Sequence, residues 1–350
     1  MSQFIQVHML TSYPPANLNR DDLGRPKTAF MGGAQRLRIS SQSLKRAWRT
    51  SDLFEKALSG HLGKRTKRKG LEVFDALKAK GVDQKVAKEW AQQIAEVFGK
   101  RESPDNDNPL KDLEIRQLAH FSPEEKAAID ALVEKLVIGR KAPTEEELKL
   151  LREKHSAVDI AMFGRMLADV PKYNTDAAVQ VAHAITVHEV AVEDDYFTAV
   201  DDLNEGRDDA GAAHLGDTEF AAGLFYLYFC IDGDLLRKNL ENEELSKRAR
   251  RALVEAATKV APTGKQNSFA SRAYASYILA EKGSQQPRSL AVAFLKPIPG
   301  KDILSDSIKL LSDTRKNIEE VYGKCAEDHK EMNAMTGMGS FEEILNFVEE

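Results

Sequence analysis

The segment 36–49 carries the residues whose types and spacing best fit the binding of an anion. Its second half has a helical pattern in which a polar stripe lies beside an apolar one. The polar stripe, at i, i+3, i+4 and i+7, consists of Gln42, Lys45, Arg46 and Arg49. The free amides at a helix start can hold a phosphate beside Ser40 and Ser41, and Lys45 and Arg49 would reach its neighbours. The alternative is an ordinary serine cap on a helix with a solvated face, and chemistry alone leaves both open.

A loop that precedes this segment adds two cations. Arg20 and Lys27 flank a stretch rich in Asp, Gly and Pro, and Gly32 and Gly33 follow. These glycines would let the backbone approach a ligand closely, so both cations are candidates for phosphate contact. The alternative is a flexible, solvated loop.

Two adjacent aromatic residues, Tyr196 and Phe197, stand in the otherwise very polar stretch 194–203. On a strand they would face opposite sides, so one could press against a nucleic-acid base while the other packs. Stacking of a base on an aromatic ring contributes about 1–3 kcal/mol and tolerates any sequence. The alternative is a small satellite core beneath a loop.

Carboxylates in the same region suggest a second kind of chemistry. Pairs of acidic residues can hold Mg²⁺, although acidic residues on an exposed hairpin are usually only solvated. The residues concerned are Asp194, Asp195, Asp201, Asp202, Asp208 and Asp209.

Other catalytic patterns are missing from the sequence. The segment 264–266 (Gly-Lys-Gln) lacks the flanking residues of a P-loop, and no Gly-x-Ser-x-Gly motif occurs. His183 and His188 lie five residues apart, so on a strand they would face opposite sides and cannot share a metal. The two cysteines are too few for a disulfide framework or a thiolate zinc site. We therefore predict no cofactor and no metal.

Charge is distributed unevenly along the 350 residues. The net charge is -5, but residues 20–69 hold 14 Lys/Arg against 4 Asp/Glu. A basic region on an acidic chain is typical of a protein with one nucleic-acid-facing surface. No apolar run approaches the length of a membrane span, and the first residues lack the pattern of a signal peptide. We expect a cytoplasmic protein with no membrane partner.

The expected elements place these residues on a recognisable framework. Strands are predicted at 4–10, 36–39, near 158, at 179–187, 224–231, 269–279 and 290–295. Helices are predicted at 41–58, 243–260, 303–320 and 341–349. Residues 60–155, rich in Lys, Glu, Asp and Ala, read as a helical insertion with helices near 71–98 and 123–138. Without the insertion the order is βαβ, βαβ, which predicts an α+β, ferredoxin-like fold, the topology of the RNA-recognition motif. The aromatic signature of that motif is absent.

Several segments resemble the guide-RNA-binding backbone subunit (CasC family) of type I-E CRISPR Cascade complexes. They are residues 18–22, 36–49, 159–166, 182–188, 196–203, 213–216 and 219–220, in this order and spacing. The resemblance covers the first 50 residues and roughly 157–230, and it is weak elsewhere. It implies a ferredoxin-like palm at 1–59, 156–192 and 223–350. The helical fingers would be at 60–155 and a long β-hairpin thumb at 193–222.

The resemblance also implies a function and a set of contacts. Copies of the subunit stack along the guide RNA (crRNA), and each thumb folds over the RNA and displaces one base. Phe197 would be the wedge, with Thr198 beside it and Met166 as an apolar contact from the palm, although Met166 could equally be a core residue. The implied RNA-binding residues are Arg20, Lys27, Ser40, Gln42, Lys45, Arg49, Met166, Phe197 and Thr198. Other partners would be target DNA, paired through the guide, the other Cascade subunits and a helicase-nuclease. The basic run 64–69 is read as a solvated surface, with contact to the target DNA as the alternative in this architecture.

Two other functions stay open at this point. In related type III complexes a thumb aspartate cleaves target RNA with a divalent metal, so the hairpin carboxylates would make this chain an enzyme. A single-copy RNA-binding protein of the same fold would need no filament. We expect a non-catalytic scaffold that binds the guide without sequence preference.

Overall fold

The computed structural model describes residues 3–199 and 214–350, which form two compact units. The first unit comprises residues 1–54, 180–231 and 250–350, and the second comprises residues 55–179 and 232–249. Each unit is described by itself.

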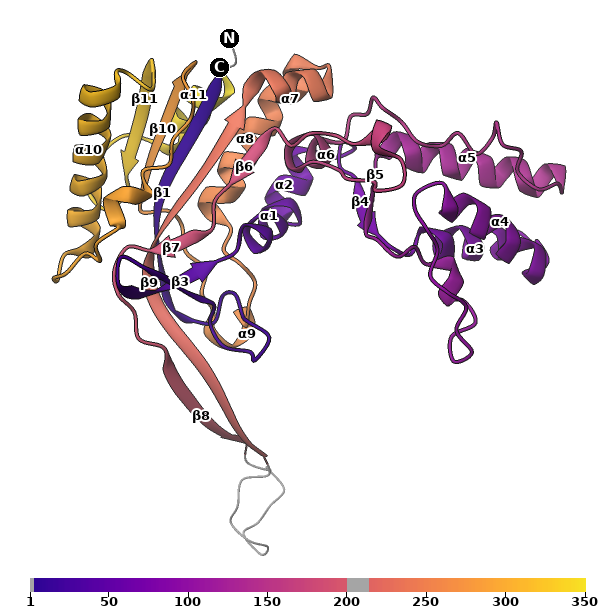
Figure 1. Cartoon of the computed structure of the whole chain (residues 1–350), viewed down its shortest axis with the longest axis horizontal. Coiled ribbons are helices and arrows are strands. Elements are labelled where there is room, and N and C mark those ends of the chain that lie inside the picture. Colours follow the sequence, from indigo (N-terminus) through magenta and orange to yellow (C-terminus); the bar gives the residue numbers. More distant parts are fainter. Residues whose placement is uncertain (1–2, 200–213) are drawn as a thin grey trace, which may run out of the picture. The chain divides into compact units, whose positions relative to one another are not determined.

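A large antiparallel sheet forms the centre of the first unit (Figure 1). Its strands are β1 (Phe4–Ala16), β2 (Thr28–Met31), β3 (Ala34–Ile39), β6 (Val179–Val181), β7 (Ala184–Thr186), β8 (Glu193–Ala199), β9 (His214–Asp232), β10 (Tyr277–Gly283) and β11 (Asp328–Asn333). The main path runs β11-β10-β1-β9-β7-β3-β2, while β6 and β8 both pair with β9. The inner order β10-β1-β9-β7, with one helix after β1 and another after β9, is that of a ferredoxin-like fold. The predicted α+β palm is therefore confirmed.

Helices cover both faces of this sheet (Figure 1). On one face lie α1 (Ser41–Arg49), the second half of α8 (Glu243–Lys259) and α11 (Phe341–Glu349). Trp48 of α1 packs on Phe229, and Thr258 of α8 contacts Met9. On the other face lie α10 (Ile303–Tyr322) and the 3-10 helix at Ala291–Phe294. Leu10, Tyr226 and Phe294 are part of the core there. Successive residues of β1 thus serve opposite faces, as strand geometry requires.

The second face of the sheet is closed by a buried polar network. His8 lies between Tyr226 Oη (2.8 Å) and Glu281 Oε2 (3.1 Å) through its two ring nitrogens. Arg288 also pairs with Glu281. His8 and Glu281 are fully buried. Aromatic rings therefore do lie on the face that the RNA-recognition motif uses for stacking, but protein covers them.

The second unit is mainly helical. It contains α2 (Asp52–Ala57, starting in the first unit), α3 (Lys69–Ala79), α4 (Gln84–Glu96), α5 (Pro123–Gly139), α6 (Val158–Phe163) and α7 (Gly233–Leu240), with the strand pair β4 (Lys64–Thr66) and β5 (Ala119–Phe121). Phe74, Trp90 and Leu136, from α3, α4 and α5, share one apolar core. Ser122 and Glu125 form a reciprocal capping box at the start of α5.

Several predicted elements differ from the structure. The strand predicted near residue 158 is helix α6. The strand predicted at 290–295 is the 3-10 helix, and that at 269–279 is α9 (Gln266–Phe269) followed by β10 from Tyr277. Short apolar runs are equally compatible with a strand and with a buried helical turn, so periodicity alone misassigned them. The helix predicted at 41–58 is broken after Arg49, because Thr50 and Ser51 turn the chain through bonds to Arg46 and Trp48.

The hairpin predicted at 193–222 is present as β8 and the first part of β9, paired from Glu193↔Phe220 to Ala199↔His214. Strand β11 was not predicted. Its segment, 328–333, is mostly charged and exposed at the sheet edge, so it carries no apolar alternation. Among the helices of the described residues, none is both long and apolar enough to cross a membrane.

The buried network makes the first unit sensitive to acid. Burial opposes ionisation of Glu281, but the bonds from His8 and Arg288 outweigh it and lower its pKa to about 2. Burial also lowers the pKa of His8. In both cases the unfolded chain takes up its proton first as the pH falls. The stabilisation is present at neutral pH and is lost progressively below the usual range of histidine and then of glutamate.

We expect Glu281→Gln to lower the free energy of unfolding by about 3 kcal/mol, because it leaves a buried arginine unpaired. Urea unfolding at pH 7.5 and pH 5 measures this loss and the change in pH dependence. Glu342→Gln, which breaks an exposed pair with Arg251, is the control and should cost less than about 1 kcal/mol. Equal losses in the two variants would contradict the role given to the network.

Candidate nucleic-acid interface

Asn19 ties together three segments of the first unit. Its side-chain Oδ1 accepts a hydrogen bond from the backbone N–H of Ser40 at 2.8 Å. Its backbone oxygen accepts from Lys27 N at 2.8 Å, and the Lys27 oxygen accepts from Arg38 N at 2.8 Å. The loop, the end of β3 and the start of α1 are therefore fixed against one another. Arg20 follows Asn19 directly and is exposed.

Helix α1 presents its polar stripe from this anchored start. Ser40 is the N-cap, and its hydroxyl accepts from Ser43 N at 3.4 Å. The first turn contains no acidic residue, so nothing there repels an anion from the helix dipole. Leu44 and Trp48 are buried beneath the helix. Lys45 and Arg49 are half-buried, whereas Gln42 is exposed.

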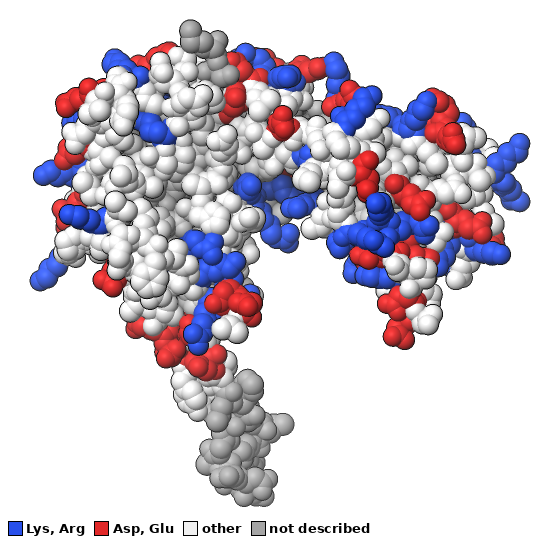
Figure 2. Space-filling view, in the orientation of Figure 1, with Lys and Arg blue, Asp and Glu red and all other residues white. Residues whose placement is uncertain are grey.

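Arg38 and His183 extend this positive surface. Arg38 Nη1 lies 2.8 Å from His183 Nδ1. Arginine can only donate, so Nδ1 accepts and the proton of the neutral ring is on Nε2. Burial and the positive charges of Arg38, Lys27 and Lys45 lower the pKa of His183. The same charges show that these four side chains occupy one neighbourhood. Figure 2 shows Lys and Arg side chains gathered over α1.

The β8–β9 hairpin carries Phe197 in a position fixed by a glycine. Phe197 stands opposite Gly216 in the strand register. A Cβ at residue 216 would lie 2.1 Å from Cζ of the Phe197 ring. The ring therefore lies across the bare backbone of Gly216, and only glycine leaves room for it. Phe197 is 43% exposed, and Tyr196, on the opposite face of the strand, is 65% exposed. Thr198 is also exposed.

The root of the hairpin is braced from both sides. The Asn17 side chain donates to the backbone oxygens of Gly24 (2.9 Å) and Glu219 (3.0 Å). Glu219 also pairs with Arg25 at 3.0 Å. On the other face Phe220 packs against Phe269, and Thr218 bonds to Lys265. The loop that carries Arg20 and Lys27 thus also supports the hairpin.

Met166, in the second unit, is not a core residue. Its side chain is 74% exposed, while Arg165 and Leu167 on either side are buried. Arg165 holds this turn rigidly through Glu125, with both carboxylate oxygens at 2.8 Å from Nη1. It also donates to the Tyr173 backbone oxygen at 2.9 Å. This exposure excludes the core alternative for Met166.

The carboxylates of the hairpin do not form a shared site where they are described. Asp194 and Asp195 are neighbours on β8 and so face opposite sides. No group of three His, Cys, Asp or Glu suited to a metal occurs within residues 3–199 and 214–350. Asp201, Asp202, Asp208 and Asp209 lie outside the described residues.

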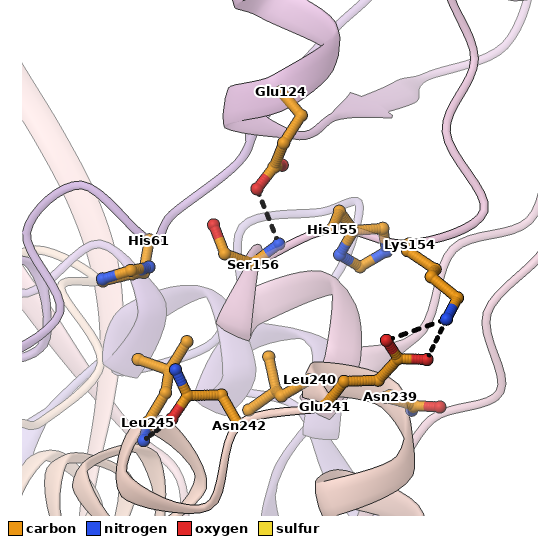
Figure 3. Close-up of a pocket in the computed structure, with 10 residues that line it drawn as sticks. All are labelled: His61, Glu124, Lys154, His155, Ser156, Asn239, Leu240, Glu241, Asn242 and Leu245. Atoms are coloured by element: carbon orange, nitrogen blue, oxygen red, sulfur yellow. Dashed lines mark hydrogen bonds and ion pairs between the residues drawn. The ribbon is translucent and has the colours of Figure 1, made fainter.

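A cavity of about 270 Å³ lies within the second unit, between α5, α7 and the segment 154–156 (Figure 3). Lys154 and Glu241 pair at its edge, and Glu124 accepts from Ser156 N at 2.8 Å. Two other lining residues, His61 and His155, keep a buried Nδ1 without a hydrogen bond. None of the nine predicted site residues lines this cavity.

The sequence and the fold were compared with those of known proteins. The family of CT1975-like Cas proteins matches residues 5–345. The chain belongs to this family. No curated protein matches it. A chain of a "CRISPR RNA-guided surveillance complex, pre-nicking" superposes with a TM-score of 0.85 at 29% identity over 99% of both chains. A chain of a second "CRISPR RNA-guided surveillance complex" gives 0.75 at 23% identity over 99% of both chains, which concerns the fold alone.

Within this CT1975-like chain the structure brings some predicted site residues together and assigns others to different elements. Lys27, Ser40 and Lys45 lie in one neighbourhood of the first unit. Phe197 and Thr198 are on the hairpin of that unit, and Met166 belongs to the other unit. Sequence analysis missed Asn19, Arg38 and the binding potential of His183. All three lie inside the segments that carry the resemblance, but Asn19 acts through a hydrogen bond and His183 was considered only as a metal ligand.

The anchoring role of Asn19 can be tested separately from the charge of the surface around it. We expect Asn19→Leu to lower the free energy of unfolding by about 1–2 kcal/mol, because it leaves the amide of Ser40 without its acceptor. Asn19→Asp keeps the acceptor and should stay within about 0.5 kcal/mol of the original. Its added negative charge should nonetheless weaken tripolyphosphate binding. Urea unfolding and calorimetric titration measure both effects, and a stable Asn19→Leu variant would refute the anchoring role.

Proposed function

We propose that this chain is a backbone subunit of a CRISPR surveillance complex and that it binds the guide RNA along its phosphate backbone without catalysing a reaction. One observation carries the proposal: Lys27, Arg38 and Lys45 all lie close enough to His183 to lower its pKa, beside the start of α1, on a chain that shares its fold over 99% of its length with a surveillance-complex chain. Cations and helix amides recognise phosphate and carry no sequence information.

The hairpin adds a contact of another kind. The ring of Phe197, which lies across the backbone of Gly216, could stack on a base. Such stacking does not depend on which base is present. Met166 offers an apolar side chain from the second unit. Phosphate contact together with stacking suits a subunit that must accept any guide, while base pairing with the guide reads the target DNA.

The finer assignment is also a proposal. The matching segments favour a type I-E Cascade, in which copies of this chain would stack along the guide with other Cascade subunits and a recruited helicase-nuclease. A cytoplasmic location fits this role. The alternative, RNA cleavage by hairpin aspartates with a metal, has weaker support, because Asp194 and Asp195 face opposite sides of β8. Incubation of the assembled complex with complementary RNA and Mg²⁺ tests it, and cuts lost on Asp→Ala substitution would revive it.

The number of bound copies should rise in proportion to guide length. Native mass spectrometry of the protein with guide-like RNAs of two lengths measures this number. One copy on either RNA would point to a single-copy RNA-binding protein, and no binding would refute the proposal.

Lys45→Ala with Arg49→Ala should weaken loading and make it less dependent on salt. Two lost phosphate contacts should reduce the slope of log affinity against log salt by about 1.4 for single-stranded RNA. The control removes two exposed lysines of α10 on the other face of the sheet, Lys309→Ala with Lys316→Ala, and should leave the slope unchanged. An unchanged slope in the first variant would remove α1 from the interface.

Phe197→Ala should weaken loading by about 5- to 150-fold, which corresponds to one lost base stack. Gly216→Ala should act in the same direction, because its methyl group must displace the ring. Tyr322→Ala, which removes an 85% exposed aromatic from the end of α10, is the matched control. Fluorescence of 2-aminopurine placed along the guide would report the displaced base, and full loading by both hairpin variants would exclude Phe197 as the wedge.

A further inference from the structure

We propose that Arg38 and His183 bind one phosphate of the guide together and that this contact takes up a proton on His183. The inference rests on the proposed function, since it names a further part of the same interface and a property that follows from it.

The geometry defines the state of the pair when no anion is bound. The 2.8 Å contact between Arg38 Nη1 and His183 Nδ1 requires a neutral imidazole, because a protonated ring has no acceptor. The side chain of His183 is exposed, and the proton on Nε2 is the donor that remains. The Arg38 backbone is held in place through Lys27, so the guanidinium fixes the orientation of the ring from a rigid strand.

The charges around His183 are all of one sign. Arg38 comes from β3, Lys27 from the loop before β2, and Lys45 from α1, and each disfavours protonation of the imidazole. Beside His183, the backbone N–H of Ala182 donates to the backbone oxygen of Tyr228 on β9. Burial raises the pKa of the Tyr228 hydroxyl, so this neighbour is uncharged at neutral pH. Among the described residues, no carboxylate acts to raise the pKa of His183 against these cations.

A phosphate bound among these cations would favour protonation of His183 instead of opposing it. It would give Arg38 a better acceptor than the imidazole, and its negative charge would favour the imidazolium form of the released ring. The pKa of His183 would then rise on binding, and binding would take up a proton wherever the pH lies between the free and bound values. Linkage requires the affinity to rise as the pH falls across this range, by at most about tenfold per pH unit for one proton.

If the Arg38–His183 contact is purely structural, the expected effect of removing it is different. If the pair only joined β3 to the segment between β6 and β7, its removal would change stability and would leave no proton uptake to lose. Proton uptake therefore distinguishes the two roles.

The experiment is calorimetric titration of the full-length protein with a short guide-like RNA from pH 5.5 to 8, in buffers of different ionisation enthalpy at constant salt. The original protein should take up close to one proton near the low end of this range and bind more tightly there. His183→Gln should lose the proton uptake and the tighter binding at low pH, because glutamine cannot take up the proton. Arg38→Gln removes one of the three cations, so the pH dependence should move to higher pH. His329→Gln, at an exposed histidine of β11, is the matched control and should behave like the original protein.

Two outcomes would overturn the inference while leaving the proposed function intact. They are RNA binding without proton uptake and an unchanged pH dependence in His183→Gln. If the protein binds no RNA, the proposed function fails, and NMR titration of His183 with and without tripolyphosphate decides the anion site separately. A raised pKa with tripolyphosphate supports the site, and an unchanged pKa refutes it.

Discussion

The hydrogen bond from Ser40 N to the side chain of Asn19 is the contact on which the candidate interface depends. Without it, the loop that carries Arg20 and Lys27 would still be bonded to β3 through backbone atoms, but it would lose its side-chain tie to the start of the helix that carries the polar stripe. Ordering several cations toward one anion costs conformational entropy, so an anchored arrangement binds more tightly than a mobile one of equal charge. A single uncharged residue therefore controls the usefulness of the charged ones.

Charge alone does not distinguish these cations from the others in the chain. Many lysines and arginines of the second unit are paired, as in Lys64–Glu72, Arg68–Glu114 and Lys111–Glu114. The basic run 64–69 is thus largely neutralised by its own surroundings. Around His183, by contrast, the acting charges are Arg38, Lys27 and Lys45, with no acid among them. A local excess of one sign, which the chain's net charge of -5 conceals, is what attracts a polyanion.

The sequence predicted the framework better than the details of the interface. Long periodic segments such as α8 and α10, and the strands of the palm, follow from apolar spacing because burial imposes it. Short runs near residues 158 and 290 did not, since a strand and a buried helical turn need the same composition. The roles of Asn19 and Gly216 were inaccessible for another reason. Each depends on a partner far away along the chain or on a cross-strand register that spacing does not reveal.

The same physics explains how a relative of the RNA-recognition topology can dispense with its usual platform. The central strands keep the rings of His8 and Tyr226 on the sheet face, but the 3-10 helix at Ala291–Phe294 and α10 cover them, and the buried pair of Glu281 and Arg288 lies beside them. A buried ion pair is costly to expose, so this face stays closed. Binding must then move to the rim of the sheet, where β3 and α1 begin and end, and to the exposed hairpin. A rim offers backbone amides, cations and one aromatic ring at a time, but few side chains that could read the edges of bases. This favours a guide that is held by its phosphates whatever its sequence.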